Sequence, residues 1–133
     1  MLMSIRFAGS KVVEAEIKGL KIVTDVPSAP GGAVTAPSPV DLLLAALGNC
    51  TSYYVLHFCE QRELPMDCIS LSIDVDRDET SKMITDIRIA IHVPADFPEK
   101  YIDPMLRAAS QCTVKKLMQN CPTIETVVES ANS

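Results

Sequence analysis

The sequence contains no tryptophan, and its three tyrosines and three phenylalanines are scattered along 133 residues. Proteins that bind single-stranded nucleic acid stack bases on aromatic side chains that lie close together. Basic residues are equally dispersed, with Lys115 and Lys116 as the only cluster, and the formal net charge is −5. Because phosphate binding depends on concentrated positive charge, we expect no nucleic-acid partner.

Several sequence motifs that carry chemistry are also missing. The chain has no glycine-rich phosphate loop, no nucleophile elbow and no dinucleotide fingerprint. It has only two histidines, His57 and His92, and its cysteines are too dispersed for a metal-ligand pattern. We therefore expect neither a cofactor nor a bound metal.

Long hydrophobic runs are absent as well. The longest apolar stretch, residues 42–47, is far shorter than the ~20 residues that a membrane span requires. The N-terminus lacks the basic start and continuous apolar core of a signal peptide. These features predict a cytoplasmic protein without a membrane partner, and the length fits a single domain over residues 1–133.

Alternating and helical patterns predict an α+β fold. Apolar residues alternate with polar ones near Ile5 and again over residues 13–17, with turns at 9–10 and 18–19, and a loop rich in proline and glycine covers 27–37. Ser38 is the expected N-cap of a long helix, with Pro39 in the first helical position and Asp41 as a capping-box partner. That helix runs to about Arg62 and is apolar on nearly all sides, so we expect it at the centre of the fold.

The C-terminal half predicts further elements of both kinds. Two alternating strands cover residues 69–75 and 87–93, with a polar hairpin link at 77–82. After a loop and a short helical turn, a second helix is expected to be capped by Asp103 and to run to about Met118. Residues 123–129 are expected to form a closing strand. The order of strands, long helix, strand pair, helix and strand is typical of the α+β class.

Five cysteines form an odd set without a C-x-x-C pair, so a disulfide framework is not expected. Cys50 lies in the long helix between small residues, which allow a substrate to approach its sulfur closely. Its side of the helix forms an apolar wall with hydroxyl and imidazole groups at one end, which suits an apolar electrophile. The residues that share this side are Leu43, Ala46, Leu47, Tyr53, Tyr54 and His57. A buried structural thiol is the alternative interpretation of Cys50.

The other cysteines divide into core residues and candidate partners. Cys59 lies on the opposite side of the long helix from Cys50 and is expected in the core, and Cys68 is expected to pack at the start of a strand. Cys112 shares a helical face with Met105, which fits either a core residue or a resolving thiol. Cys121 is the second candidate for the resolving thiol.

A reactive cysteine must be a thiolate, and that form needs a stabilising neighbour. Cys50 lies about three turns into its helix, whereas the helix dipole acts mainly within the first turn. We therefore expect a side chain to activate Cys50, and arginine is the best candidate because it is always charged. Among the five arginines we select Arg6, which lies on a strand and can face either the site or solvent.

Two segments resemble the OsmC/Ohr family. Residues 37–51, PSPVDLLLAALGNCT, resemble the cysteine-bearing central helix of that family, and residues 108–112, AASQC, resemble its second-cysteine helix. The spacing of the cysteines and the order of elements extend the resemblance over nearly the whole chain. The resemblance implies antiparallel sheets wrapped around long central helices in an intertwined homodimer, with the active sites at the subunit interface.

The resemblance also implies a thiol-dependent reduction of organic or inorganic hydroperoxides. Cys50 would become a sulfenic acid, Cys112 would condense with it to a disulfide, and a dithiol such as a lipoyl group would reduce the pair. Two positions differ from the peroxidase branches of the family: Val40 stands where they have a glutamate, and Thr113 where they have a proline. The alternative function is a binding protein that holds a small thiol or acyl ligand in the dimer cleft.

Overall fold

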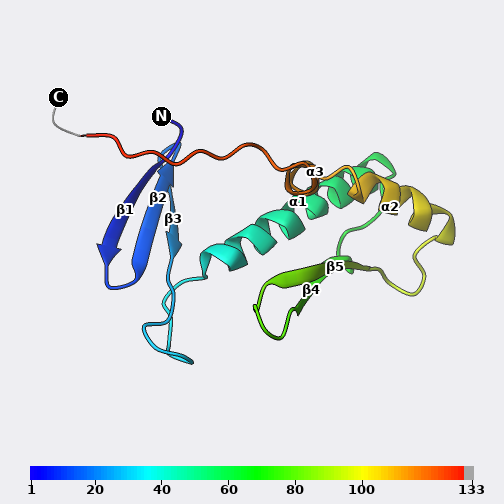
Figure 1. Cartoon of the computed structure of the whole chain (residues 1–133). Coiled ribbons are helices and arrows are strands. Elements are labelled where there is room, and N and C mark those ends of the chain that lie inside the picture. Colours follow the sequence, from blue (N-terminus) through cyan, green and yellow to red (C-terminus); the bar gives the residue numbers. More distant parts are fainter. Residues whose placement is uncertain (131–133) are drawn as a thin grey trace. The chain divides into compact units, whose positions relative to one another are not determined.

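The computed structural model describes residues 1–130 and has mixed α and β structure (Figure 1), which confirms the predicted α+β class. The chain divides between Ala46 and Leu47 into two compact units. One helix, α1 (Pro39–Gln61), continues across the division. The expectation of a single domain over the whole chain stays a prediction.

The first unit contains an antiparallel sheet of three strands, β1 (Ser4–Gly9), β2 (Val12–Ile17) and β3 (Leu20–Thr24), in that order. Both tight turns between the strands lie where the sequence predicts them. Ser10 and Lys18 adopt a positive φ of 52° in these turns, and each has a glycine with positive φ beside it. Such left-handed turns match the twist of paired strands, so they set the register of the sheet.

Asp25 organises the loop between β3 and α1. Its backbone N–H donates to the carbonyl of Pro37 at 3.1 Å, and its carboxylate accepts from the backbone N–H of Val26 and of Thr35, both at 2.9 Å. The Thr35 hydroxyl donates a further bond at 3.1 Å. The buried carboxylate thus holds together a loop without regular structure directly before α1.

The start of α1 confirms the predicted capping box. The N–H of Asp41 donates to Ser38 Oγ at 3.1 Å, and the N–H of Ser38 donates to Asp41 Oδ2 at 3.0 Å. These two bonds satisfy backbone donors that a helix start leaves unpaired. The helix ends at Gln61, one residue before the predicted end.

By length and composition alone, α1 is long and apolar enough to cross a membrane. The core helix of a water-soluble domain has the same composition, and α1 supplies most of the core of the second unit. Its inward-facing side chains are buried: Leu47, Thr51, Val55, Phe58 and Cys59. A buried hydrophobic cluster combines three of these side chains, Val55, Phe58 and Cys59, with Met105 and Ala109.

The second unit also contains a hairpin of β4 (Ser70–Arg77) and β5 (Ile84–His92), which confirms the two predicted strands. The hairpin packs closely on α1 near the cysteine. A Cβ atom at Gly48 would lie 2.9 Å from Cδ1 of Ile73, so the absence of a side chain at Gly48 permits this approach. Ile73 pairs with Ile89 across the hairpin, and Val75 pairs with Ile87.

The predicted extent of the second helix is wrong. The structure has a 3₁₀ turn, η1 (Glu99–Tyr101), followed by two separate helices, α2 (Ile102–Ala109) and α3 (Thr113–Gln119). Asp103 lies inside the first turn of α2, whose N-cap is Tyr101 without a side-chain bond. The chain therefore leaves helical geometry at Cys112, where the sequence predicts a continuous helix.

The predicted closing strand at 123–129 is also wrong, because residues 121–130 have no regular secondary structure. A strand needs a neighbour that supplies backbone hydrogen bonds. The alternation of apolar and polar residues in this segment does not by itself supply such a neighbour.

Candidate active site around Cys50 and Cys112

Cys112 occupies the junction between α2 and α3. It is the N-cap residue of α3, with a non-helical backbone (φ −49°, ψ 120°), and its Sγ accepts a hydrogen bond from the N–H of Lys115 at 3.4 Å. Ser, Thr and Asp make the same bond with oxygen at ordinary N-caps. The residue is completely buried, so the helix break fixes its sulfur inside the second unit.

The Cys112 sulfur is also in hydrogen-bonding contact with the thiol of Cys50 and the hydroxyl of Thr51. As a thiol, Cys112 can donate to the carbonyl of Leu47, 3.9 Å away. The Thr51 hydroxyl lies 2.9 Å from that same carbonyl, so its hydrogen can point either to Leu47 or to the sulfur. The structure thus brings together the two cysteines that the sequence selects, at a site made by α1 and the start of α3.

The two thiols differ in exposure, and the acidity of Cys112 is raised by its surroundings. Burial raises the pKa of Cys112, but hydrogen bonds from the N–H of Lys115, from Thr51, from Cys50 and from the N–H of Val114 together outweigh burial, and the pKa lies below its ordinary value. Cys50 is only partly buried. The thiolate form of the buried sulfur is therefore stabilised, and the more accessible sulfur is one of its hydrogen-bond donors.

Two of the residues predicted to bind substrate lie beside this pair. The Leu47 carbonyl contacts Cys112, and Tyr54 shares a hydrogen bond of 3.0 Å with the hydroxyl of Thr113, the residue after Cys112. Tyr53 keeps 70% of its surface exposed. Leu43 and Ala46 are exposed on the first half of α1, before the division between the units. The residues of the predicted apolar wall thus differ in exposure and in their closeness to the cysteine pair. A role for them in substrate binding stays a prediction.

Arg6, the predicted activating cation, belongs to the first unit. Its guanidinium forms an ion pair of 2.6 Å with Glu14, the residue opposite it on β2, and most of the side chain is exposed. Because Arg6 and Cys50 lie in different units, the role of Arg6 at the thiol stays a prediction. Thr51 and the N–H of Lys115 are the stabilising groups that the sequence does not reveal.

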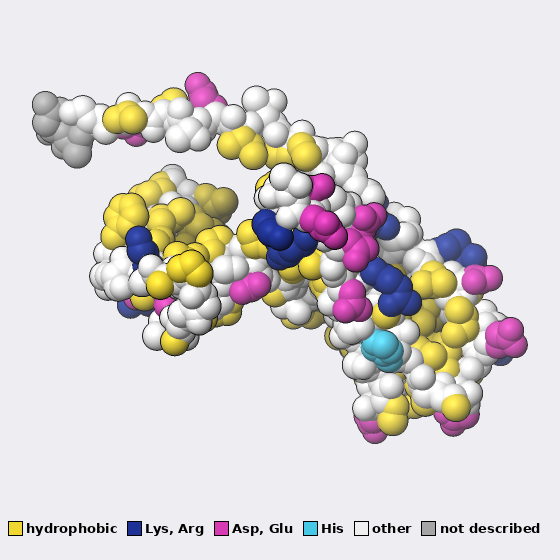
Figure 2. Space-filling view, turned by 60° about the horizontal axis from the view of Figure 1, so that its bottom comes forward, with side chains coloured by type: hydrophobic (Ala, Val, Ile, Leu, Met, Phe, Trp, Pro, Cys, Tyr) yellow, Lys and Arg dark blue, Asp and Glu magenta, His cyan; other side chains and the backbone are white. Residues whose placement is uncertain are grey.

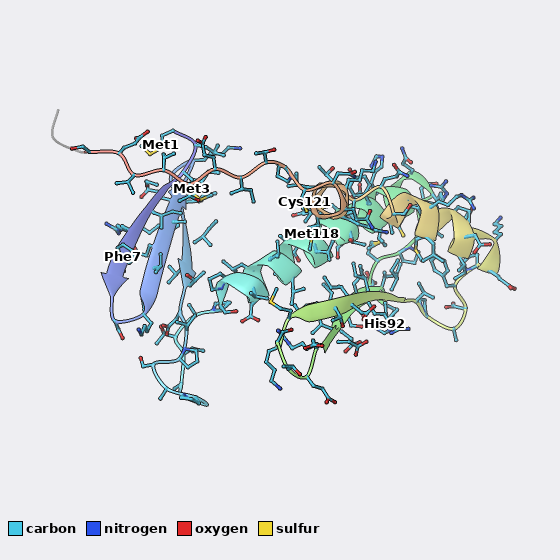
Figure 3. The ribbon with its side chains drawn as sticks, viewed as in Figure 1. Met1, Met3, Phe7, His92, Met118 and Cys121 are labelled. Carbon is cyan, nitrogen blue, oxygen red and sulfur yellow. The ribbon has the colours of Figure 1, made fainter. Side chains whose placement is uncertain are left out.

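The remaining cysteines lie apart from this pair. Cys59 is fully buried, and burial raises its pKa although Arg62 nearby acts in the opposite direction. Cys68 is exposed, so the prediction that it packs at a strand is wrong. Cys121 is exposed after α3 (Figure 3), and its Sγ donates to the carbonyl of Met118 at 3.2 Å. No group of three or more potential metal ligands occurs within residues 1–130.

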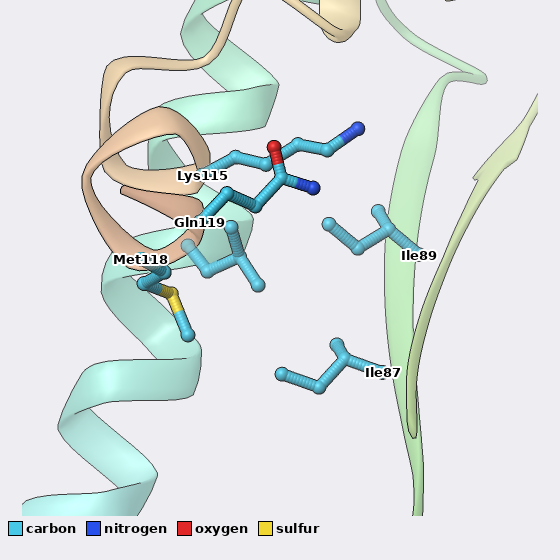
Figure 4. A pocket seen from close by; sticks show the side chains of 6 residues that line it. Ile87, Ile89, Lys115, Met118 and Gln119 are labelled. Atoms are coloured by element: carbon cyan, nitrogen blue, oxygen red, sulfur yellow. The ribbon is translucent and has the colours of Figure 1, made fainter. Parts of the chain in front are cut away.

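A cavity of about 320 Å³ lies within the second unit, lined by residues of α1, β5 and α3 (Figure 4). Leu47, Ile87, Ile89 and Met118 give it apolar walls, and Lys115 and Gln119 add polar groups. Two of these residues, Leu47 and Lys115, bond to the Cys112 sulfur through their backbones. The cavity is therefore a candidate binding space for an apolar molecule next to the thiols.

The sequence model of the OsmC-like protein family matches residues 30–127, which include both cysteines. The chain belongs to this family. None of the curated proteins is significantly similar to the chain in sequence.

Solved structures share the fold of this OsmC-like protein. A Psychrobacter arcticus 273-4 protein, named for osmotic stress induction and a detoxification response, has 20% identity and a TM-score of 0.72, with 87% of this chain and 86% of that chain covered. The organic hydroperoxide resistance protein OhrB of Bacillus subtilis has 16% identity and a TM-score of 0.53, with 90% and 93% covered. An organic hydroperoxide resistance protein OsmC from Legionella pneumophila has 16% identity and a TM-score of 0.57, with 90% of each chain covered.

Proposed function

We propose that this OsmC-like protein is a thiol-dependent hydroperoxide reductase in which Cys50 and Cys112 form the redox pair. The observation that carries the proposal is the hydrogen-bonded contact between a partly accessible Cys50 and a buried Cys112. Membership of the family, some of whose structural neighbours are named hydroperoxide resistance proteins, supports it. Two sulfurs in contact need little movement to form a disulfide.

The first step consumes the hydroperoxide. Cys112 accepts the proton of Cys50 through their hydrogen bond, which leaves a thiolate on the more accessible sulfur. This thiolate attacks the terminal oxygen of the hydroperoxide, the O–O bond breaks, and Cys50 becomes a sulfenic acid. The departing alkoxide takes the proton back from Cys112 and leaves as an alcohol. Cys112 is then a thiolate again.

The second step forms the disulfide. The Cys112 thiolate attacks the sulfur of the Cys50 sulfenic acid, the S–O bond breaks, and hydroxide leaves to become water with a proton from solvent. A dithiol reductant, such as a lipoyl group, then reduces the disulfide by thiol exchange and is itself oxidised to a disulfide. The hydrogen bonds from Thr51 and Lys115 favour the thiolate form of Cys112 in both steps.

One equivalent of cumene hydroperoxide tests the proposal. The reduced protein should lose two free thiols, and peptide mapping should recover Cys50 linked to Cys112. Cys112→Ser should form the Cys50 sulfenic acid more slowly, because the proton acceptor is lost, and should stop there, where dimedone traps it. Cys68→Ser serves as the matched control because Cys68 is exposed and lies outside the pair. If Cys50 and Cys112 both stay reduced in the wild type, the proposal is wrong.

The apolar cavity favours a second candidate function, a binding protein for a small thiol or acyl ligand. In that case Cys50 forms at most a mixed disulfide with the ligand. Native mass spectrometry of the purified protein should then show a bound species that Cys50→Ser or a filled cavity, Ile89→Phe, removes. Absence of any bound species under several growth conditions would count against this second function.

The proposal also includes the homodimer and the cytoplasmic location that the sequence predicts. Support for the homodimer comes from the apolar surface of each unit (Figure 2). Phe7 on β1 is 92% exposed, and Leu20 on β3 and Tyr53 on α1 are also exposed. Monomeric proteins rarely leave large apolar patches in water. Sedimentation equilibrium should give twice the monomer mass, and Phe7→Glu should reduce it; a wild-type monomer at micromolar concentration would refute the dimer.

A further inference from the structure

A second cavity of about 330 Å³ lies between α1 and α2, entirely within the second unit. Arg62 and His57 line it from α1, and Arg107 lines it from α2. No aspartate or glutamate lines it. In a chain with a formal net charge of −5, this concentration of cationic side chains without an acid is unusual.

The two arginines keep hydrogen-bond donors available for a ligand. The guanidinium carbon of Arg62 lies over the ring of Phe58, 3.7 Å from its centroid, and the guanidinium donates one bond of 3.2 Å to the carbonyl of the same residue. Within residues 1–130 the only ion pair is Arg6 with Glu14, so neither Arg62 nor Arg107 is neutralised by a carboxylate there. A guanidinium has five N–H donors in a fork that matches a carboxylate. Stacking on Phe58 orients the Arg62 fork in advance.

The cavity lies on the same face of α1 as Cys50, because Tyr54, Phe58 and Arg62 follow Cys50 at intervals of four residues. Tyr54 lines the cavity and also bonds to Thr113, next to Cys112. Tyr54 lies one helical turn after Cys50, a rise of about 6 Å, and Arg62 lies about 18 Å along the helix from Cys50. The wall between these points is largely apolar, with Phe58, Pro104 and Ala108.

We propose that Arg62 and Arg107 bind the carboxylate end of a chain-shaped organic anion whose other end reaches Cys50. This inference rests on the proposed function, because it names the charge and shape of a molecule that reacts at that thiol. The carboxylate can belong either to the hydroperoxide or to the dithiol reductant. In both cases the apolar wall accommodates the chain, and the guanidinium groups fix its direction.

Binding of decanoate, measured by calorimetry on the full-length protein, tests the inference without any redox chemistry. Decanoate carries no peroxide and no thiol, so its binding does not depend on peroxidase turnover. Arg107→Met should weaken decanoate binding about tenfold, the loss expected for one charge-assisted contact. The Arg107 side chain is exposed and has no hydrogen bond or ring contact among residues 1–130, and the bond that the Arg107 carbonyl accepts from Ser110 Oγ does not need the side chain. This variant should therefore fold normally.

Lys115→Met is the matched control, because it removes one positive charge from the other cavity. It should leave decanoate binding unchanged, and the affinity of neutral decanol should be the same in all three proteins. Equal decanoate affinity in the wild type and Arg107→Met overturns the inference. Loss of binding in Lys115→Met instead overturns it too, because the carboxylate would then lie in the other cavity.

Competition kinetics identify the source of the anion. If decanoate raises the KM for a hydroperoxide, the carboxylate belongs to the peroxide. If decanoate raises the KM for the dithiol instead, the carboxylate belongs to the reductant. An active enzyme in which decanoate raises neither overturns the inference. An inactive protein that still binds decanoate through Arg107 refutes the proposed function alone, so the two failures are distinguishable.

Discussion

The Sγ of Cys112 accepts a hydrogen bond from the backbone N–H of Lys115 at 3.4 Å, which makes a sulfur atom the N-cap of α3. A thiolate accepts such a bond better than a thiol does, because ionised partners make stronger hydrogen bonds. The same bond that begins the helix therefore stabilises the charged form of the sulfur. Helix geometry and thiol chemistry at this site depend on one another.

Thr51→Val should raise the pKa of Cys112, because it removes one hydrogen-bond donor to the thiolate. Ser52→Ala is the matched control. Both hydroxyls donate to the carbonyl four residues earlier, but only Thr51 contacts the sulfur. The measurement is thiolate absorbance at 240 nm against pH, as the difference between each protein and its Cys112→Ser counterpart.

Disulfide formation at neutral pH should slow by up to about tenfold in Thr51→Val, as expected for the loss of a charge-assisted bond. Ser52→Ala should keep the wild-type rate. Identical titration curves for the two variants would show that Thr51 does not stabilise the thiolate.

The sequence predicts most of the fold for local reasons. The capping box of Ser38 and Asp41 lies within four residues, so the start of α1 can be read directly. The alternation in β4 and β5 and the glycine turns of the first sheet are also local signals. Such features do not depend on distant parts of the chain, and the structure confirms them.

The helix break at Cys112 depends instead on a tertiary contact. No proline or glycine lies between Met105 and Gln119, so local rules predict a continuous helix. The structure breaks the helix where the Cys112 sulfur meets Leu47 and Cys50 from α1, more than sixty residues earlier. The sequence could therefore select the two cysteines but not their hydrogen bonds.

Cys59 should be the least reactive thiol of the protein. Burial raises its pKa, and its side chain has no exposed surface. Pulse alkylation with iodoacetamide at pH 8, followed by mass mapping, should label Cys68 and Cys121 first and Cys59 only on unfolding. Both Cys68 and Cys121 are exposed and serve as internal controls. Labelling of Cys59 at the rate of Cys68 in the native protein would contradict its place in the core.

Asp25 should make the first unit sensitive to acid. The N–H of Thr35 is the largest cause of its lowered pKa, and the Thr35 hydroxyl and the N–H of Val26 add to it, whereas burial opposes them. A carboxyl whose pKa is lower in the folded state stabilises the fold above its unfolded pKa of about 3.9, and this contribution is lost as the pH falls through the folded value.

Asp25→Asn should therefore lower the thermal midpoint at pH 7 and reduce its dependence on pH below about 4. Asp96→Asn is the matched control, since Asp96 is exposed in another loop and its carboxylate accepts no hydrogen bond within residues 1–130. Circular dichroism melts from pH 3 to pH 7 provide the measurement. If the thermal midpoint depends on pH equally in Asp25→Asn and in the wild type, the loop does not need the carboxylate.

Gly48 should be more sensitive to the size of a new side chain than to helix propensity. A Cβ there lies 2.9 Å from Cδ1 of Ile73, the far end of a side chain that can rotate, so Gly48→Ala should be close to neutral. A helical alanine gains about 1 kcal/mol over glycine, which offsets the cost of moving that methyl group. Gly48→Val adds two more carbons against β4 and should destabilise by about 2 kcal/mol.

The double variant Gly48→Ala with Ile73→Val separates the two contributions. Ile73→Val removes the Cδ1 atom that meets the new Cβ, so the alanine should now stabilise the protein by about 1 kcal/mol relative to Ile73→Val alone. Urea unfolding of the four proteins gives the coupling. Because Gly48 lies two residues before Cys50, Gly48→Val should also slow disulfide formation, whereas Gly48→Ala should not. No coupling between positions 48 and 73 would mean that α1 does not approach β4 at Gly48.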